Sequence, residues 1–92
     1  MKIREIRKDE FERRKEKATK TYSEKHSKYS MTYFVVEKGN NTFDLLIHDL
    51  QIYDYAKVPE EDDESYKLEE DVTENWIRSE SGIELKEFKE VE

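Results

Sequence analysis

Residues 31–52 read MTYFVV, then EKGNN, then TFDLLIHDLQI, and they form the densest apolar segment of the chain. β-Branched and aromatic residues flank a Gly-Asn centre, which is typical of two strands joined by a turn. The pattern predicts a β-hairpin over about residues 31–50. Alternation across the pleat divides its second strand into two sets, one of Phe43, Leu45 and Ile47 and the other of Asp44, Leu46, His48 and Leu50. Both sets contain apolar groups, so we expect both faces to be covered.

The segment after the hairpin is predicted to be extended and then helical. Residues 52–58 suggest a third strand or an irregular extended segment that stops at Pro59. From about residue 65 to residue 80, apolar side chains recur every four residues, which favours a helix. These side chains are Leu68, Val72 and Trp76. Residues 83–92 fit either a last strand or a short helix.

A long, charged helix is predicted before the hairpin, over about residues 8–28. This segment contains neither Gly nor Pro, and one narrow apolar stripe follows it at spacings of seven, four and seven. The stripe consists of Phe11, Ala18, Tyr22 and Tyr29. Residues 1–7 fit a frayed helical turn or a short edge strand, and we favour the helical turn.

The predicted fold class is α+β: an N-terminal charged helix, an antiparallel sheet of two to three strands and a C-terminal helix packed on the sheet. A length of 92 residues favours one small domain. Its expected segments are a polar helix (1–28), a sheet core (29–58), an acidic loop (59–64) and a helix with a tail (65–92).

Charge is distributed unevenly along the chain. Residues 1–29 contain eleven Lys and Arg against six Asp and Glu, whereas residues 30–92 contain six against eighteen. The formal net charge is −7, and charged residues make up 45% of the chain. Regions of opposite sign either attract each other within the monomer or present different surfaces to different partners.

The expected location is the cytoplasm. The chain contains no cysteine, which excludes disulfides and Cys-based zinc sites and suits a reducing compartment. No apolar run approaches the ~20 residues that a membrane-spanning helix needs. The first residues also lack the apolar segment of a secretion signal.

Acidic and aromatic side chains around Pro59 form the leading candidate for a partner-binding surface. Closely spaced carboxylates can imitate the negative charge of a nucleic-acid backbone, and tyrosines are favoured at the centres of interfaces. The candidate residues are Glu60, Glu61, Asp62, Asp63, Glu64, Glu69, Glu70, Asp71, Tyr53, Tyr55 and Tyr66. The plainer alternatives are a solvated acidic loop and tyrosines at the boundary of the core.

A basic stretch in the N-terminal segment is the candidate for a nucleic-acid-binding surface. It consists of Arg13, Arg14, Lys15, Lys17 and Lys20, and such side chains dominate affinity for phosphates. Three glutamates, Glu10, Glu12 and Glu16, are interleaved with it and weaken this interpretation.

The sequence offers little for catalysis or metal binding. The two histidines are His26 and His48, and on a strand Asp44 would lie ~13 Å from His48, too far to share a metal ion. The acidic run lacks the alternating ligands of a calcium-binding loop. Gly39 and Gly82 are the only glycines, so a glycine-rich phosphate loop is excluded. We expect no enzymatic activity, no cofactor and no metal.

In size and composition, and through no motif, the chain resembles small inhibitors encoded by phages and mobile genetic elements, including anti-CRISPR proteins and DNA mimics. The resemblance implies a protein that blocks the basic, nucleic-acid-handling surface of a partner protein by charge mimicry. An immunity protein or antitoxin that covers a basic nuclease is an alternative. The remaining alternatives are a nucleic-acid-binding module and a self-associating structural protein.

Overall fold

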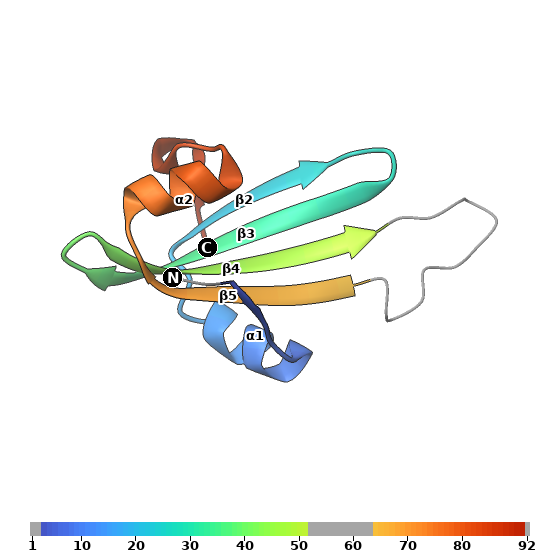
Figure 1. The fold of residues 1–92 in the computed structure, drawn as a ribbon, viewed down its shortest axis with the longest axis horizontal. Coiled ribbons are helices and arrows are strands. Elements are labelled where there is room, and N and C mark those ends of the chain that lie inside the picture. Colours follow the sequence, from blue (N-terminus) through green and yellow to red (C-terminus); the bar gives the residue numbers. More distant parts are fainter. Residues whose placement is uncertain (1–2, 52–63, 92) are drawn as a thin grey trace.

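A six-stranded antiparallel sheet forms the centre of the protein in the computed structural model, which describes residues 3–51 and 64–91. The strand order is β1-β5-β4-β3-β2-β6, with helices on both sides (Figure 1). In chain order the elements are β1 (Arg4–Glu5), α1 (Lys8–Lys15), β2 (Lys20–Lys25), β3 (Tyr29–Gly39), β4 (Thr42–Gln51), β5 (Glu64–Val72), α2 (Glu74–Ser81), the 3-10 helix η2 (Leu85–Glu87) and β6 (Lys89–Glu90). The class is α+β, but the expected sheet of two to three strands is wrong.

The central hairpin consists of β3 and β4, which pair from Tyr29 with Gln51 to Gly39 with Thr42. Its turn places Gly39, Asn40 and Asn41 at φ values of 108°, 52° and 55°. Glycine and asparagine tolerate this left-handed region better than other residues, which is why the Gly-Asn-Asn sequence turns the chain here.

The predicted helix over residues 8–28 is wrong. The segment contains the short helix α1, a turn and then the strand β2. Its apolar stripe is divided among three elements, since Phe11 lies in α1, Tyr22 in β2 and Tyr29 in β3. The sequence Thr-Tyr-Ser at residues 21–23 has side chains that favour a strand over a helix, and pairing with β3 decides the outcome.

The predicted helix over residues 65–80 is wrong in its first half, because β5 precedes α2. The spacing of four between Leu68 and Val72 is an even number, so it fits one face of a strand as well as one face of a helix. The helix begins only after Thr73, whose hydroxyl accepts the backbone N–H of Trp76 at 3.2 Å.

A β-bulge near the end of β5 changes the face of the sheet toward which the following side chain points. The register between β4 and β5 shifts between Phe43 and Leu45, and Asp71 adopts a φ of 56° within the bulge. Leu68 therefore belongs to the apolar cluster on one face of the sheet, while Val72 belongs to the cluster on the other.

The two ends of the chain supply the edge strands of the sheet. Residues 1–7 contain the edge strand β1 in place of the favoured helical turn. Residues 83–92 contain both of the alternatives, a 3-10 helix and the strand β6. The expected third strand over 52–58 and residues 59–63 of the expected acidic loop lie outside the described residues.

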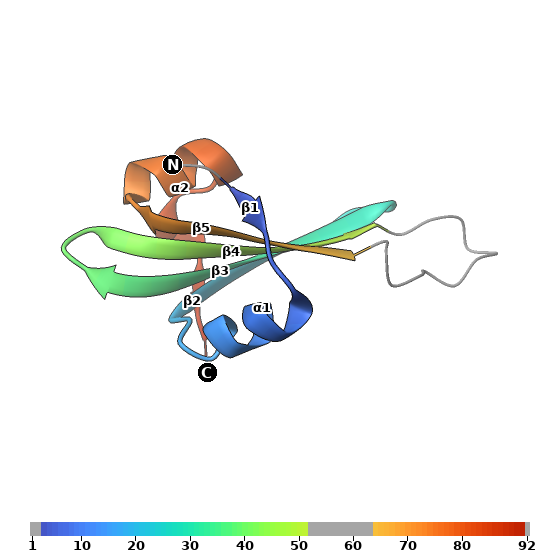
Figure 2. The ribbon, with the colours of Figure 1, turned by 60° about the horizontal axis from the view of Figure 1, so that its bottom comes forward.

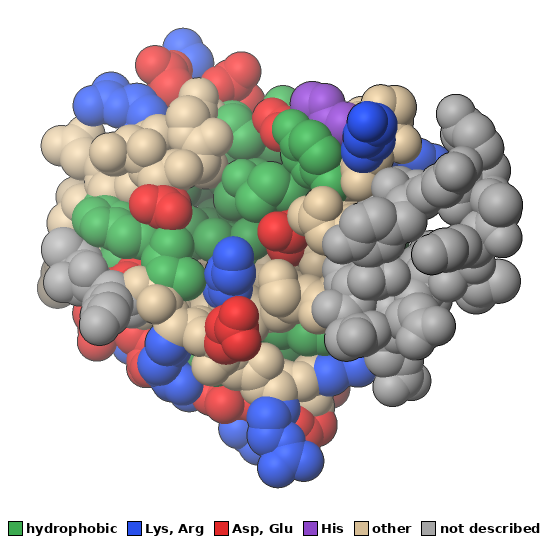
Figure 3. Space-filling model, turned by 45° about the vertical axis from the view of Figure 1, so that its right-hand side comes forward, with side chains coloured by type: hydrophobic (Ala, Val, Ile, Leu, Met, Phe, Trp, Pro, Cys, Tyr) green, Lys and Arg blue, Asp and Glu red, His purple; other side chains and the backbone are tan. Residues whose placement is uncertain are grey.

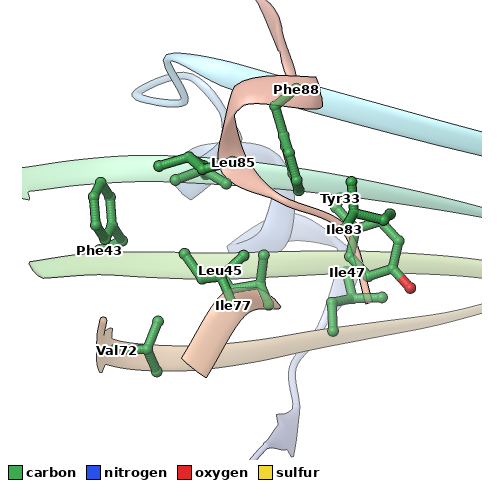
Figure 4. Packing of buried hydrophobic residues seen from close by; sticks show 10 residues of the cluster. Tyr33, Phe43, Leu45, Ile47, Val72, Ile77, Ile83, Leu85 and Phe88 are labelled. Atoms are coloured by element: carbon green, nitrogen blue, oxygen red, sulfur yellow. The ribbon is translucent and has the colours of Figure 1, made fainter. Parts of the chain in front are cut away.

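Both faces of the sheet are covered near the centre (Figure 2). On the α2 face, which we define as the side against which α2 packs, Ile77 and the C-terminal segment through Phe88 cover β3, β4 and β5 (Figure 4). On the opposite side, the α1 face, Phe11 packs against Leu46 and Leu68. In the described part of the chain, no helix has the length and apolar character needed to cross a membrane.

Candidate partner-binding site

An open hollow lies on the α2 face of the sheet. Its volume is about 430 Å³. Figure 3 shows a hollowed apolar area with charged side chains around it. The lining residues are Ile3, Glu5, Met31, Tyr33, Ile47, Lys67 and Glu80.

The hollow exists because the strands extend past the helix that covers them (Figure 1). Cross-strand pairing sets Tyr33 beside Ile47 in the sheet, and Met31 beside Asp49. On the far side of β3, Glu24 of β2 is the partner of Met31. Apolar and acidic side chains from neighbouring strands are thereby brought together on one face.

Four carboxylates surround the hollow. Glu5 and Glu80 line it, and Glu24 and Asp49 flank Met31 in a single cross-strand row. Lys67 is the one cation among the lining residues, and it forms no ion pair with any residue that the structure describes. The charge around this apolar floor is therefore predominantly negative.

The pKa of Tyr33 reflects the charges around the hollow. Its side chain is almost buried, with 6% exposed, and its hydroxyl donates to Sδ of Met31 at 3.8 Å. Burial raises the pKa of Tyr33, and the negative charges of Glu24, Glu80 and Asp49 raise it further. These carboxylates belong to β2, α2 and β4, so three separate elements contribute to one negative field.

The combination of an apolar floor and an acidic rim suits a long cationic side chain. Lys and Arg bury an aliphatic stem against apolar groups while the charged end stays at the rim. Carboxylates at that rim would complement the charge and favour encounter with a basic surface.

No protein-family model, curated protein or solved structure matches this chain. The geometry of the hollow and the charges around it are therefore what point to a function.

Of the predicted acidic run, Glu60 to Glu64, the structure describes only Glu64. Glu60, Glu61, Asp62 and Asp63 lie outside the described residues. Glu64 begins β5, where it pairs with Leu50 on the α1 face, and its Oε1 lies 3.1 Å from Nε2 of His48. Glu64 thus faces away from the hollow.

The second group of predicted acids is either buried or paired within the protein. Glu69 is only 2% exposed. Glu70 accepts a hydrogen bond from Nη2 of Arg4 at 2.9 Å, which is the main reason that its pKa is lowered. Oδ1 of Asp71 lies 2.7 Å from Nζ of Lys38. These three carboxylates leave little negative charge free for a partner.

The predicted tyrosines do not gather at the hollow. Tyr53 and Tyr55 lie outside the described residues. Tyr66 lies on the α1 face, where its ring stacks on His48 with 4.8 Å between centroids and approaches Phe11 at 4.9 Å. Tyr66 therefore packs at the boundary of the core, on the side opposite the hollow.

The predicted basic residues are divided among three places. A groove of about 590 Å³ is lined by Arg13, Arg14, Lys17, Val36, Glu37, Lys38 and Asp44. Lys15 instead lies over the ring of Phe34, 5.5 Å from its centroid, and Lys20 lies 3.9 Å from Glu90. Two carboxylates in the groove reduce its positive charge.

The structure does not bring together a metal-binding cluster in its described part. No group of three or more His, Asp or Glu side chains there could hold a metal ion. His48 is engaged with Glu64 and stacked on Tyr66. The absence of enzymatic activity stays a prediction from the sequence.

Sequence reasoning missed Glu24, Asp49 and Glu80 as a group. Glu24 and Glu80 were expected on helices at opposite ends of the chain, and Asp49 in a strand between them. The available signal was the alternation of Tyr29, Met31 and Tyr33, which put three large side chains on one face of a predicted strand. Only the correct pairing of β2 with β3 brings the acids around them.

Proposed function

We propose that this chain is a small binding protein whose α2-face hollow contacts a basic surface of another protein. The observation that carries the proposal is the hollow itself, in which the apolar side chains of Ile3, Met31 and Ile47 lie beside the carboxylates of Glu5 and Glu80. The partly exposed Ile3 and Met31 supply apolar area to bury, and the acidic rim selects cationic side chains.

Binding would act by occupancy. A partner whose basic surface handles nucleic acid would lose access to its ligand while this protein covers that surface, as with DNA mimics and phage-encoded inhibitors of the anti-CRISPR type. The proposal that the partner handles nucleic acid is supported by the negative net charge and the small size of the chain. An immunity protein or antitoxin that covers a basic nuclease would use the same surface. We place this action in the cytoplasm, consistent with the lack of cysteine.

The experiment compares two double variants with equal changes of charge. Asp49→Asn with Glu80→Gln removes two carboxylates from the hollow. The matched control, Glu12→Gln with Glu16→Gln, removes two exposed carboxylates from the α1 helix and its C-terminal end. Immobilised wild-type protein captures partners from the cells that encode it, and the affinity of each purified partner is then measured against both variants.

Loss of the two rim charges is expected to weaken binding about tenfold, chiefly through a slower association rate that high salt masks. The control should bind as the wild type does. An equal loss of partner affinity in both variants, or no loss of affinity in either, would contradict the proposed site. Competition between this protein and nucleic acid for the captured partner then tests inhibition by occupancy.

Direct binding of nucleic acid is the second candidate function. Arg13 and Lys17 line the groove beside α1 and form no ion pair within the described residues. If this groove bound phosphates, a fluorescent 20-base-pair DNA would bind at 150 mM salt, and Arg13→Glu with Lys17→Glu would abolish that binding. The leading proposal expects no binding of this DNA by the wild type.

A further inference from the structure

The outer edge of β2 is covered over only part of its length. β6 pairs with Lys20 and Thr21 alone. The chain that leads into β6 turns inward, because Phe88 packs into the core with its ring 5.6 Å from that of Tyr22. β2 itself continues to Lys25, so its second half has no neighbour on the outer side within the described part of the protein.

Along this edge, two residues of β2 direct backbone groups outward that form no backbone hydrogen bond within the described residues. The N–H of Val91 reaches the carbonyl of Thr19 from the outer side at 3.1 Å, and the N–H of His26 donates to Tyr29 on the inner side at 2.7 Å. Successive residues of an antiparallel strand direct their backbone groups to opposite sides. Ser23 and Lys25 therefore direct theirs outward, and no backbone bond from a described residue meets them there.

We propose that an extended segment of the basic partner binds to β2 at Ser23 and Lys25 as an added strand, an inference that rests on the proposed function. Main-chain bonds at an open sheet edge provide affinity for any extended segment, and the neighbouring side chains provide selectivity. Tyr22 and Glu24 lie on the α2 face, in the cross-strand rows of Tyr33 and Met31. A strand added here extends the acidic, apolar face around the hollow.

A second copy of this chain is a poor occupant of the edge. Antiparallel pairing of two β2 edges through Ser23 and Lys25 sets Glu24 directly opposite Glu24 of the other copy. If the second copy is shifted by one step toward the turn between β2 and β3, Lys25 lies opposite Lys25 of the other copy. If it is shifted by one step in the other direction, it must pair with Thr21, which β6 already covers. Like charges that lie directly opposite are destabilising. The edge instead favours a strand with a cation opposite Glu24 and an apolar residue opposite Tyr22.

The first test uses a synthetic peptide as the probe, acetyl-Thr-Lys-Thr-Val-Thr-Lys-Thr-amide. In an extended conformation its Lys and Val side chains share one face, and the backbone groups of its Thr residues share one edge. Hydrogen exchange is followed by NMR on the full chain. The amides of Ser23 and Lys25 are expected to exchange at least tenfold more slowly with the peptide, while those of Tyr22 and Glu24, already bonded to β3, should not change.

Two N-methylated peptides serve as matched controls for the backbone contact. Methylation of the Thr nitrogens removes the donors that face β2 and should abolish the protection. Methylation of the Lys and Val nitrogens blocks only the opposite edge and should preserve it. The proposal is overturned if Ser23 and Lys25 exchange at the same rate with and without the unmodified peptide, or if both methylated peptides behave alike.

A protein variant links the edge to the captured partner. Ser23→Pro removes an outward N–H at an edge position, where proline is tolerated, and Ser23→Ala keeps that N–H. Proline should weaken partner binding at least tenfold and alanine should not. If the hollow variant Asp49→Asn with Glu80→Gln weakens binding while Ser23→Pro does not, the edge inference fails and the proposed function stands; the reverse result retains the edge and refutes the hollow.

Discussion

The carboxylate of Asp44 accepts a hydrogen bond from the backbone N–H of Asp71, with 3.1 Å between Oδ1 and N. Lys38 joins the pair, because its Nζ lies 3.5 Å from Oδ1 of Asp44 and 2.7 Å from Oδ1 of Asp71. This contact holds the bulge that turns Val72 onto the α2 face. A buried carboxylate therefore positions the strand end that leads into α2.

Removal of the Asp44 carboxylate should destabilise the fold. Asp44 is 8% exposed, so Asp44→Ala leaves the N–H of Asp71 unpaired at the bulge and is expected to lower the free energy of unfolding by about 2 kcal/mol. Urea denaturation followed by circular dichroism measures this change. Asp71→Gly is the matched control, because it relieves the left-handed φ but loses an exposed ion pair, and the two effects should nearly cancel. Equal stability of Asp44→Ala and wild type would contradict this role.

Glu69 offers a stabilising substitution. Its side chain is 2% exposed, and within the described residues its Oε2 has no hydrogen-bond partner. A buried carboxylate oxygen without a hydrogen-bond partner is unfavourable, so Glu69→Met is expected to raise the free energy of unfolding by about 1 kcal/mol. The neighbour Glu70, which is paired with Arg4, provides the contrast, since Glu70→Met should not stabilise. Loss of stability in Glu69→Met would show that this carboxylate has a partner in solution.

The pair of Arg4 and Glu70 should make stability depend on acid pH. The hydrogen bond from Arg4 lowers the pKa of Glu70 in the folded state. The unfolded chain then binds more protons at Glu70, so the stabilisation is present above the usual carboxyl pKa and is lost as the pH falls through the lowered folded-state pKa. An NMR titration of the Glu70 carboxyl carbon checks this. Arg4→Gln should raise the pKa toward its usual value, and no change on this substitution would argue against the pair.

Tyr33 should titrate above its usual pKa, and the acids around the hollow should contribute to the shift. Burial is the largest cause, so Asp49→Asn with Glu80→Gln is expected to lower the pKa of Tyr33 without restoring its ordinary value. NMR of ring-labelled tyrosine follows the titration. Because the unfolded chain loses its tyrosine proton first, this residue makes the fold less stable as the pH rises from about 10 toward the folded-state pKa. An unchanged pKa in the double variant would place these carboxylates too far from Tyr33 to act on it.

The sequence was sufficient for the central hairpin because its two signals agree. The Gly-Asn-Asn turn and the β-branched strands specify the same structure, and the expected division of faces in β4 is the one observed, with Phe43, Leu45 and Ile47 on the α2 face and Leu46 on the α1 face.

The flanking segments were assigned wrongly because their spacings are compatible with both structures. Side chains four apart share a face in a helix and also in a strand, so Leu68 and Val72 could not distinguish the two. The segment of β2 was predicted to be helical because it lies among charged residues that are good helix formers. Its pairing with β3 outweighs that helix propensity. Strand pairing is a contact between distant residues, which spacing along the chain does not reveal.

The candidate site depended on the same distant contacts. Runs of acids were visible in the sequence, but the structure buries Glu69 and pairs Glu70 with Arg4 and Asp71 with Lys38. The carboxylates around the hollow are instead isolated in sequence, and only the sheet brings them together.

Reversal of charge in the hollow tests its role in partner binding most directly. Asp49→Lys with Glu80→Lys turns the acidic rim basic, and Glu12→Lys with Glu16→Lys makes the same change of charge on the other side of the sheet. The dissociation constant of the captured partner should rise about a hundredfold for the hollow variant at low salt and only a few fold for the control. Equal dissociation constants for the two variants would contradict the assignment of the hollow as the partner-binding surface.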